Sequence, residues 1–234
     1  MAANLLISGL PAAEQHRLEP LFERVALGDG EDLVRPGQSV DFIWFIEGAV
    51  VFTAQPIPNR PHIAAGLAGN EGVAGFELWL GRKVSPLSTV AGIGGDALRM
   101  NADDLQRHVL ERPSALNKAI GDFVFHFLTM GAQMAVCLAT HSPEERLCRW
   151  LQMIHLRTPG RERFPISESQ IASFLNMEAH TALLAIRVLE QAGLIQFRDR
   201  QVEILDEEGL QEGCCDCLTL FQEQMTRLRG PAQA

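Results

Sequence analysis

The chain has 234 residues, a length that suits two domains of unequal size better than one compact domain. Hydrophobic residues make up 47% and charged residues 21%, which is enough apolar surface for a buried core and excludes an intrinsically disordered chain. The net charge of −9 excludes a protein coated with cations for nonspecific binding to nucleic acid.

The N-terminal residues and the cysteines indicate the cellular compartment. The N-terminus lacks a basic segment followed by a long apolar run, so we expect no signal peptide. Charged residues interrupt every candidate membrane span, and five cysteines, an odd number, favour reduced thiols over disulfides. We therefore expect a cytoplasmic protein with no membrane segment.

Arginines outnumber acidic residues only in residues 143–200, so a contact with DNA is expected there.

The first predicted domain, residues 1–112, combines a short helix with many short strands. Residues 11–23 have the amphipathic pattern of a helix. Between residues 25 and 100, short β-branched and aromatic runs alternate with turn residues, which predicts a sandwich or a small barrel. Asn101 is then expected to cap a helix that continues to Glu111.

Residues 113–141 contain the clearest periodic signal and predict one long helix. One apolar stripe repeats every 3.5 residues, as in the seam of a two-helix coiled coil. A second stripe, Ala119, Val124 and Leu128, is available for packing on the helix's own domain. We expect the first stripe to form a dimer interface, the alternative being that it packs inside its own chain. Its members are Leu116, Ile120, Phe123, Phe127, Met130, Met134 and Cys137.

Residues 142–234 are predicted to be a helical domain with a β-hairpin. Ser142 and Ser167 are expected to cap helices, the latter with Gln170 as its capping-box partner. Asn176 suits a left-handed turn before a second helix, which we expect at residues 178–191 with Gly193 after its end. The inward face of that helix is predicted to be Ala182, Leu183, Ile186 and Leu189. Residues 194–205 predict two strands, and residues 206–228 predict one C-terminal helix.

Five segments in this order resemble Crp/Fnr transcription regulators over nearly the whole chain. They are VRPGQSVDFIWFIEGAV, NEGVAG, the long heptad helix, PEERLCRWL, and ISESQIASFLN…VLEQAGLI…VEILDEEGL. The resemblance implies an α+β fold with a cupin-like, cyclic-nucleotide-binding-like β-roll, a long dimerisation helix and a C-terminal winged helix-turn-helix. It also implies a homodimer whose recognition helices enter successive major grooves of a two-fold operator, and an effector sensed in the roll.

Two effector signatures of the family are absent. Phe76 occupies the position of a ribose-binding glutamate, no Arg-Ser/Thr-Ala follows it, and Pro86 removes a backbone donor. We therefore expect neither cyclic AMP nor cyclic GMP to bind. Oxygen-sensing members carry an N-terminal cysteine cluster, whereas the first cysteine here is Cys137, so an iron–sulfur cluster in that position is not expected.

The predicted recognition helix also departs from the family pattern. Ala179, His180 and Leu184 stand where members often have Arg, Glu and Arg. Losing the arginines removes bidentate contacts to guanine worth about 1–3 kcal/mol each. Arg161 and Arg163 in the preceding loop are further candidate cations. The candidate DNA contacts are Ser167, Ser169, Ala179, His180, Thr181, Arg187, Arg198 and Arg200.

The cysteines at 214, 215 and 217 admit two interpretations. Three thiols within four residues suit a soft metal or an oxidant sensor. However, adjacent residues of one helix point about 100° apart, and acidic neighbours raise thiol pKa values. We therefore favour small buried hydrophobic residues and expect neither a metal nor a cofactor. His126, His141 and His155, which show no ligand spacing to cysteines or acids, are interpreted as packing or hinge residues.

Three classes of function remain, of which a DNA-binding regulator ranks first. The second is an interaction protein that keeps the regulator fold without binding DNA, which the acidic C-terminal segment and the missing arginines favour. The third is a cupin-type metalloenzyme, which needs converging histidines and carboxylates. The roll contains a single histidine, His62, so we expect no enzyme.

Overall fold

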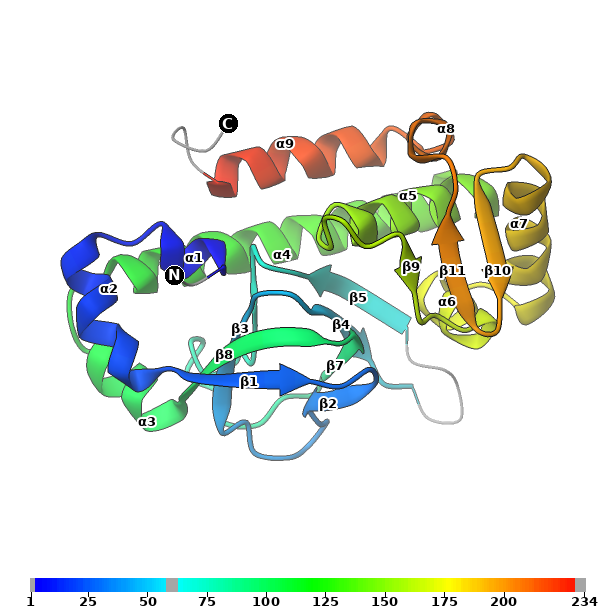
Figure 1. Cartoon of the computed structure of the whole chain (residues 1–234). Helices are drawn as coiled ribbons and strands as arrows, with labels where there is room; N and C mark the ends of the chain where they lie inside the picture. Colours follow the sequence, from blue (N-terminus) through cyan, green and yellow to red (C-terminus); the bar gives the residue numbers. More distant parts are fainter. Residues whose placement is uncertain (1–2, 58–62, 230–234) are drawn as a thin grey trace.

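The computed structural model describes residues 3–57 and 63–229, so His62 lies outside the described residues. A β-roll lies along one long helix, α4, and a helical C-terminal part continues beyond the end of α4, with α9 returning beside it (Figure 1). The N-terminal part comprises α1 (Leu5–Ser8), α2 (Ala12–Leu18), the 3-10 turn η1 (Glu19–Leu21), β1 (Glu23–Leu27), β2 (Glu31–Val34), β3 (Phe42–Ile46), β4 (Val50–Gln55), β5 (Ile63–Ala68), β6 (Val73–Ala74), β7 (Ser88–Ile93), β8 (Gly95–Asn101), α3 (Ala102–Leu105) and the π-helical turn η2 (Gln106–Leu110). The remainder comprises α4 (Ala115–Thr140), α5 (Pro143–His155), β9 (Arg163–Phe164), α6 (Glu168–Phe174), α7 (Ala179–Gln191), β10 (Ile195–Arg198), β11 (Gln201–Ile204), α8 (Glu207–Glu212) and α9 (Cys217–Arg229).

The β-roll consists of two four-stranded antiparallel sheets. Their strand orders are β1-β8-β3-β6 and β2-β7-β4-β5. Ile43 and Phe45 of β3 and Ile93 of β7 are fully buried between the sheets, which confirms the predicted sandwich. The Asn101 side chain accepts a hydrogen bond from the Asp104 backbone N–H at 2.8 Å, so the expected helix cap is also confirmed.

One apolar face of α4 packs against its own chain, which makes the predicted dimer seam wrong. Phe127 and Phe123 lie over Gly66 and Gly72, where an added Cβ would be only 2.6 Å and 2.4 Å from the rings. A 3.5-residue repeat indicates that a helix face is buried, but it does not identify the neighbour that buries it. The seven predicted seam residues, each at most 7% exposed, are Leu116, Ile120, Phe123, Phe127, Met130, Met134 and Cys137.

The opposite face of α4 carries a second apolar repeat that is open to solvent. Phe125 and Leu128 are 69% and 65% exposed, and exposed apolar groups this large on one helix face are typical of a protein interaction surface. By length and a mean hydropathy of 1.5, α4 is also the one described helix long and apolar enough to span a membrane, a test that core helices of soluble proteins also pass. The expectation that charged residues interrupt every candidate span is therefore wrong for α4, because residues 123–140 contain no Asp, Glu, Lys or Arg. The repeat, called the exposed α4 stripe below, consists of Phe125, Leu128, Ala132, Ala135 and Ala139.

A buried ion pair joins the C-terminal part to the β-roll. Arg157, which follows α5, donates from Nε to Glu71 Oε1 at 2.7 Å and from Nη1 to the Met153 carbonyl at 2.9 Å. Both side chains of the Arg157–Glu71 pair are 1% exposed. The Arg157 guanidinium also lies 4.4 Å from the ring centroid of Phe221 on α9. A single side chain therefore connects the roll, α5 and α9.

Three aromatic rings form a second contact between the two parts. Phe52 of β4 stacks on Phe174 of α6, with ring centroids 4.4 Å apart, and on Trp150 of α5, with centroids 5.7 Å apart. Gly92 of β7 leaves room for the Phe52 ring, since a Cβ there would lie 1.7 Å from it. These contacts fix α5 and α6 against the roll.

The C-terminal segment forms two helices where the sequence predicts one. The expected helix at 206–228 is interrupted by a turn at residues 213–216, which separates α8 from α9. Gly213 at the start of the turn disfavours helix and packs close to α5, where its Cβ would lie 3.0 Å from Cys148 Sγ. After the turn, α9 runs beside α4 (Figure 1).

Removing one partner of the Arg157–Glu71 pair is expected to destabilise the protein strongly. Glu71→Ala leaves a buried guanidinium without its carboxylate, which costs about 3–5 kcal/mol of unfolding free energy. The matched control is Glu23→Ala, which breaks an exposed pair with Arg99 and is expected to cost less than about 1 kcal/mol. Urea unfolding followed by tryptophan fluorescence measures both. Similar midpoints for the two variants would contradict a structural role for the buried pair.

Candidate nucleic-acid interface

α6 and α7 form a helix-turn-helix whose local geometry follows from four residues. The Ser167 hydroxyl accepts from the Gln170 backbone N–H at 3.3 Å, and the Gln170 side chain accepts from the Ser167 N–H at 2.9 Å. This capping box starts α6 as expected. Asn176, with a φ of 47°, occupies the left-handed turn before α7, and Gly193, with a φ of 74°, follows its end. All three local predictions are confirmed.

The wing is a hairpin of β10 and β11, extended by β9 through β11. Arg198 and Gln201 are its last paired residues, and the two residues between them are Asp199 and Arg200, with φ of 52° and 59°. Two consecutive positive φ values define the turn type whose twist matches that of antiparallel strands. The predicted hairpin is therefore confirmed, and its tip carries exposed Arg198 and Arg200.

The free face of α7 is more apolar than the sequence predicts. Leu184 and Val188 are 56% and 47% exposed. Leu183, predicted to face inward, is 39% exposed, and Ala185 is buried in its place. The helix therefore presents one solvent-facing stripe at the helical spacing of three and four residues. Its members are His180, Leu183, Leu184, Arg187, Val188 and Gln191.

The cations near the helix-turn-helix fall into two groups. Arg187, Arg198 and Arg200 are exposed and form no ion pair with any other described residue. By contrast, Arg163 contacts a carboxylate oxygen of Glu203 at 2.9 Å, and Arg161 donates to a backbone carbonyl of the roll at 3.2 Å. The loop arginines are thus held by partners within the chain, while those of α7 and the wing face solvent.

The predicted polar contacts differ in how accessible they are. Ser167 is only 6% exposed and its hydroxyl is used in the α6 cap, so the predicted phosphate contact at this residue is wrong. Ser169 is exposed, with its hydroxyl 3.0 Å from that of Ser167. Ala179 and His180 are exposed in the first turn of α7, and His180 Nε2 lies 3.3 Å from the Thr181 hydroxyl. His180 stands seven residues, about two helical turns, before Arg187, so these two side chains project from the same face of α7.

The position of the nucleotide cassette in the roll is filled by side chains. Phe76, at the expected ribose site, packs on Phe127 of α4 with ring centroids 5.1 Å apart. The neighbouring Glu77 is buried and accepts a hydrogen bond from the Ser85 hydroxyl at 2.5 Å. Phe76 therefore offers no polar group at the expected ribose site, while the second Glu77 oxygen, Oε2, is buried without a hydrogen-bond partner among the described residues.

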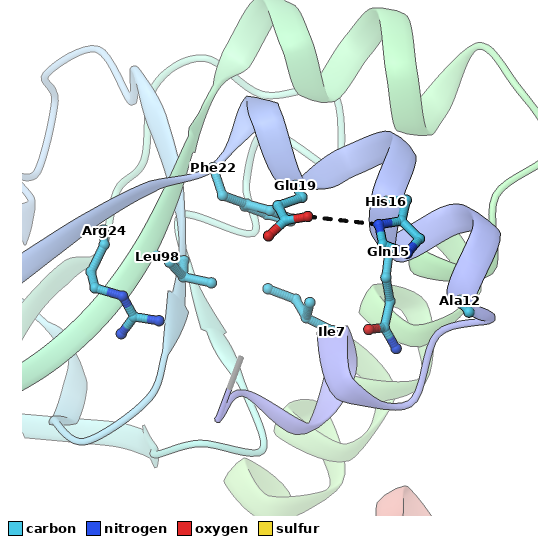
Figure 2. A pocket seen from close by; sticks show the side chains of 8 residues that line it. All are labelled: Ile7, Ala12, Gln15, His16, Glu19, Phe22, Arg24 and Leu98. Carbon is cyan, nitrogen blue, oxygen red and sulfur yellow. Dashed lines mark ion pairs between the residues drawn. The ribbon is translucent and has the colours of Figure 1, made fainter. Parts of the chain in front are cut away.

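A cleft of about 430 Å³ lies on the outside of the roll, between α1, α2 and the edge formed by β1 and β8. Figure 2 shows its side chains, with the ion pair between His16 and Glu19 at its rim, 3.9 Å apart. Phe22 and Leu98 supply apolar wall, and Arg24 adds a cation that pairs with Glu47.

In the structure, cysteines that are distant in the sequence lie close together. Cys215 in the α8–α9 turn and Cys217 at the start of α9 meet Cys137 and His141 at the end of α4. The expectation that His141 has no cysteine partner is wrong, because its Nδ1 lies 3.6 Å from Cys217 Sγ. Burial raises the pKa of the Cys215 thiol to about 12 and also raises that of Cys137. The cause is desolvation rather than the acidic neighbours we expected.

Ser167 and Ser169 are expected to differ in how much their hydroxyls stabilise the fold. Ser167→Ala removes a helix cap and should lower the unfolding free energy by about 1 kcal/mol. Ser169→Ala removes an exposed hydroxyl and should change it by no more than about 0.5 kcal/mol. Urea unfolding of the two variants side by side checks this difference, and equal midpoints would argue against the capping role.

Comparison with known proteins agrees with this geometry. Residues 145–212 match the family model of the Crp-like helix-turn-helix domain. FixK2 from Bradyrhizobium japonicum is similar with a TM-score of 0.67, at 13% identity over 83% of this chain and 98% of that chain. The c-di-GMP-responsive global regulator CLP from Xanthomonas campestris is similar with a TM-score of 0.66, at 15% identity over 84% and 100%.

A CRP/FNR family transcriptional regulator from Thermus thermophilus is also similar, with a TM-score of 0.64 at 19% identity over 82% of this chain and 97% of that chain. No curated protein sequence matches the chain. The roll, the long helix and the helix-turn-helix thus occur in these solved structures in the same order, which confirms the expected α+β architecture. The chain therefore has the fold of Crp/Fnr-type transcription regulators, and its residues 145–212 match the Crp-like helix-turn-helix domain.

Proposed function

We propose that this chain is a homodimeric transcription regulator that binds a two-fold DNA operator through α7 and the wing. The observation that carries the proposal is the solvent-facing stripe of α7 together with wing arginines that form no ion pair with any other described residue, within a region that matches a Crp-like helix-turn-helix. The proposed units are residues 1–112 for sensing, 113–141 for dimerisation and 142–234 for DNA binding. We place the protein in the cytoplasm, not on a membrane, and assign it no enzymatic activity.

The chemistry of α7 suits a particular kind of base reading. His180 is able to hydrogen-bond the N7 or O6 atoms of guanine, and Thr181 is able to contact a thymine methyl or a phosphate. Leu183, Leu184 and Val188 offer no hydrogen bonds, but an apolar surface of this kind contacts thymine methyl groups in the major groove. The operator half-site is therefore expected to contain thymines opposite these side chains.

Few cations are available to neutralise phosphates. Each subunit offers Arg187 on α7 and Arg198 and Arg200 on the wing, none of which is held by a carboxylate among the described residues. Because each neutralised phosphate contributes about −0.9 to the slope of log affinity against log salt, the slope is expected to be shallow. The acidic net charge of −9 further weakens nonspecific binding.

The exposed α4 stripe is the proposed dimer interface. Its members Phe125 and Leu128 are large and solvent-facing, and the smaller alanines at 132, 135 and 139 let two helices approach closely. The spacing of alternating three and four residues suits the seam of two helices that supercoil around each other. A second copy presents the same stripe, so the contact is self-complementary about a two-fold axis.

Charge placed in the exposed α4 stripe is expected to separate the dimer. Phe125→Asp/Leu128→Asp puts carboxylates into the seam, which opposes association but leaves the monomer core intact. The control Asp122→Asn changes an exposed residue of α4 outside the stripe and should remain a dimer. Light scattering at micromolar concentration measures the mass. A wild-type monomer, or an unaffected dimer in the double variant, would exclude this interface.

Two substitutions are expected to separate base reading from phosphate binding. His180→Ala should reduce preference for the selected site by about fivefold, or about 1 kcal/mol, with little change on other DNA. Arg198→Ala should weaken binding to all sequences alike and reduce the salt slope by about 0.9 for each phosphate that is no longer neutralised. Affinities on a selected site and on scrambled DNA, measured at several salt concentrations, distinguish these effects.

The exposed apolar residues of α7 also favour a second candidate, an interaction protein that keeps the fold without binding DNA. Leu184 is 56% exposed where arginines of the family read guanine. Selection from a random DNA pool, with and without cell extract to supply an effector, discriminates the two functions. If no sequence is enriched under either condition, the DNA-binding proposal fails and the interaction protein takes its place.

A further inference from the structure

Four potential metal ligands converge where α4 ends and α9 begins. Cys137 and His141 are one helical turn apart on α4 and its C-cap, and Cys215 and Cys217 come from the turn before α9 and the start of α9. Their ligand atoms all lie within 4.8 Å of one another, and the three cysteines are buried. Three thiols and one imidazole form a donor set that favours zinc over magnesium or calcium.

We propose that Cys137, His141, Cys215 and Cys217, called the Cys3His cluster below, bind one zinc ion in a tetrahedral site that ties α9 to the end of α4. This site is separate from the DNA-binding surface and from the cleft of the roll. The proposal does not depend on DNA binding, because it concerns how the last two helices are fastened to the rest of the chain.

The measured separations match two opposite edges of such a tetrahedron. With Zn–S bonds of about 2.3 Å and a Zn–N bond of about 2.1 Å, tetrahedral geometry requires S–S edges of about 3.8 Å and S–N edges of about 3.6 Å. Cys137 Sγ lies 3.7 Å from Cys215 Sγ, and Cys217 Sγ lies 3.6 Å from His141 Nδ1. The side chains therefore need only small movements to reach a common ion.

The surroundings of the cluster supply hydrogen bonds and positive charge. Gln133 donates from Nε2 to Cys217 Sγ at 3.0 Å, a contact that stabilises a metal-bound thiolate. Arg146 and Arg149 are 8% and 4% exposed, and both interact electrostatically with Cys137. Neither guanidinium has a carboxylate partner among the described residues.

The charge balance gives these buried arginines a physical role. Three thiolates and one Zn²⁺ leave the loaded site with a single net negative charge. A buried guanidinium without a counter-charge is costly, and a nearby anionic site reduces that cost. The sequence led us to interpret the cysteines as small buried hydrophobic side chains. In that case Arg146 and Arg149 would lie beside neutral thiols, with no negative charge to compensate them. The zinc site therefore accounts for the cysteines and the arginines together.

The decisive experiment measures metal in the full-length, reduced protein produced without a histidine tag. Mass spectrometry of the purified protein should find about one zinc per chain. The metal-free, reduced protein should take up one Co²⁺ per chain, with the visible d–d bands of tetrahedral cobalt and a thiolate-to-cobalt charge-transfer band. Chelation of zinc should lower the melting temperature, and returning zinc should restore it.

Matched cysteine variants locate the site. Cys215→Ser and His141→Ala should weaken Co²⁺ binding at least tenfold and change or abolish the charge-transfer band. Cys214→Ser and Cys148→Ser should leave stoichiometry and spectrum unchanged, since these thiols lie outside the cluster. Whether the site exists is decided by Co²⁺ uptake of the wild-type protein. A variant that fails to fold therefore does not change that result.

Three outcomes would overturn the proposal. The first is a reduced, folded wild-type protein that takes up no Co²⁺. The second is loss of the bands in Cys214→Ser to the same extent as in Cys215→Ser. The third is an isolated protein that contains a Cys137–Cys215 disulfide and, after reduction, binds no metal. None of these outcomes bears on the operator, so failure here is distinct from failure of the proposed regulator function.

Discussion

The buried pair of Arg157 and Glu71 is the constraint on which the arrangement of the two parts depends. A guanidinium and a carboxylate at 1% exposure have to remain together, because separating them leaves an uncompensated charge away from water. The pair therefore fixes the turn after β5 against the end of α5, and the stack of Phe52 on Phe174 fixes α6. α7 packs on α5, α6 and β10 rather than on the roll, so its outer face stays free at the end of the molecule (Figure 1).

Features that depend on neighbouring residues were predictable from the sequence. The caps at Ser142 and Ser167 and the left-handed Asn176 follow from hydrogen bonds and sterics within a few residues, and the structure has all three. The face of α4 that is buried was not predictable in this way. Both of its stripes are apolar, and the choice between them depends on Gly66 and Gly72, distant glycines that make room for Phe127 and Phe123.

The convergence of the cysteines was missed for the same reason, although one local signal was present. Cys137 and His141 stand four residues apart, so a helix places them on one face. The second pair, Cys215 and Cys217, meets them only because the chain turns at Gly213 and brings α9 back along α4. Helix periodicity alone predicts one continuous helix, in which these thiols point in different directions. The chain turns instead, because Gly213 packs closely against Cys148 of α5.

The end of α4 brings the two proposals together without merging them. Ala139 belongs to the exposed α4 stripe, whereas Cys137, two residues earlier, faces the interior, since residues two apart on a helix point to nearly opposite sides. His141 directly precedes Ser142, the cap of α5, and α5 packs against α7. The Cys3His cluster therefore borders the α4–α5 junction, while the proposed dimer face of α4 lies on the other side of the helix. The proposed dimer contact and the proposed zinc site thus use opposite faces of one helix.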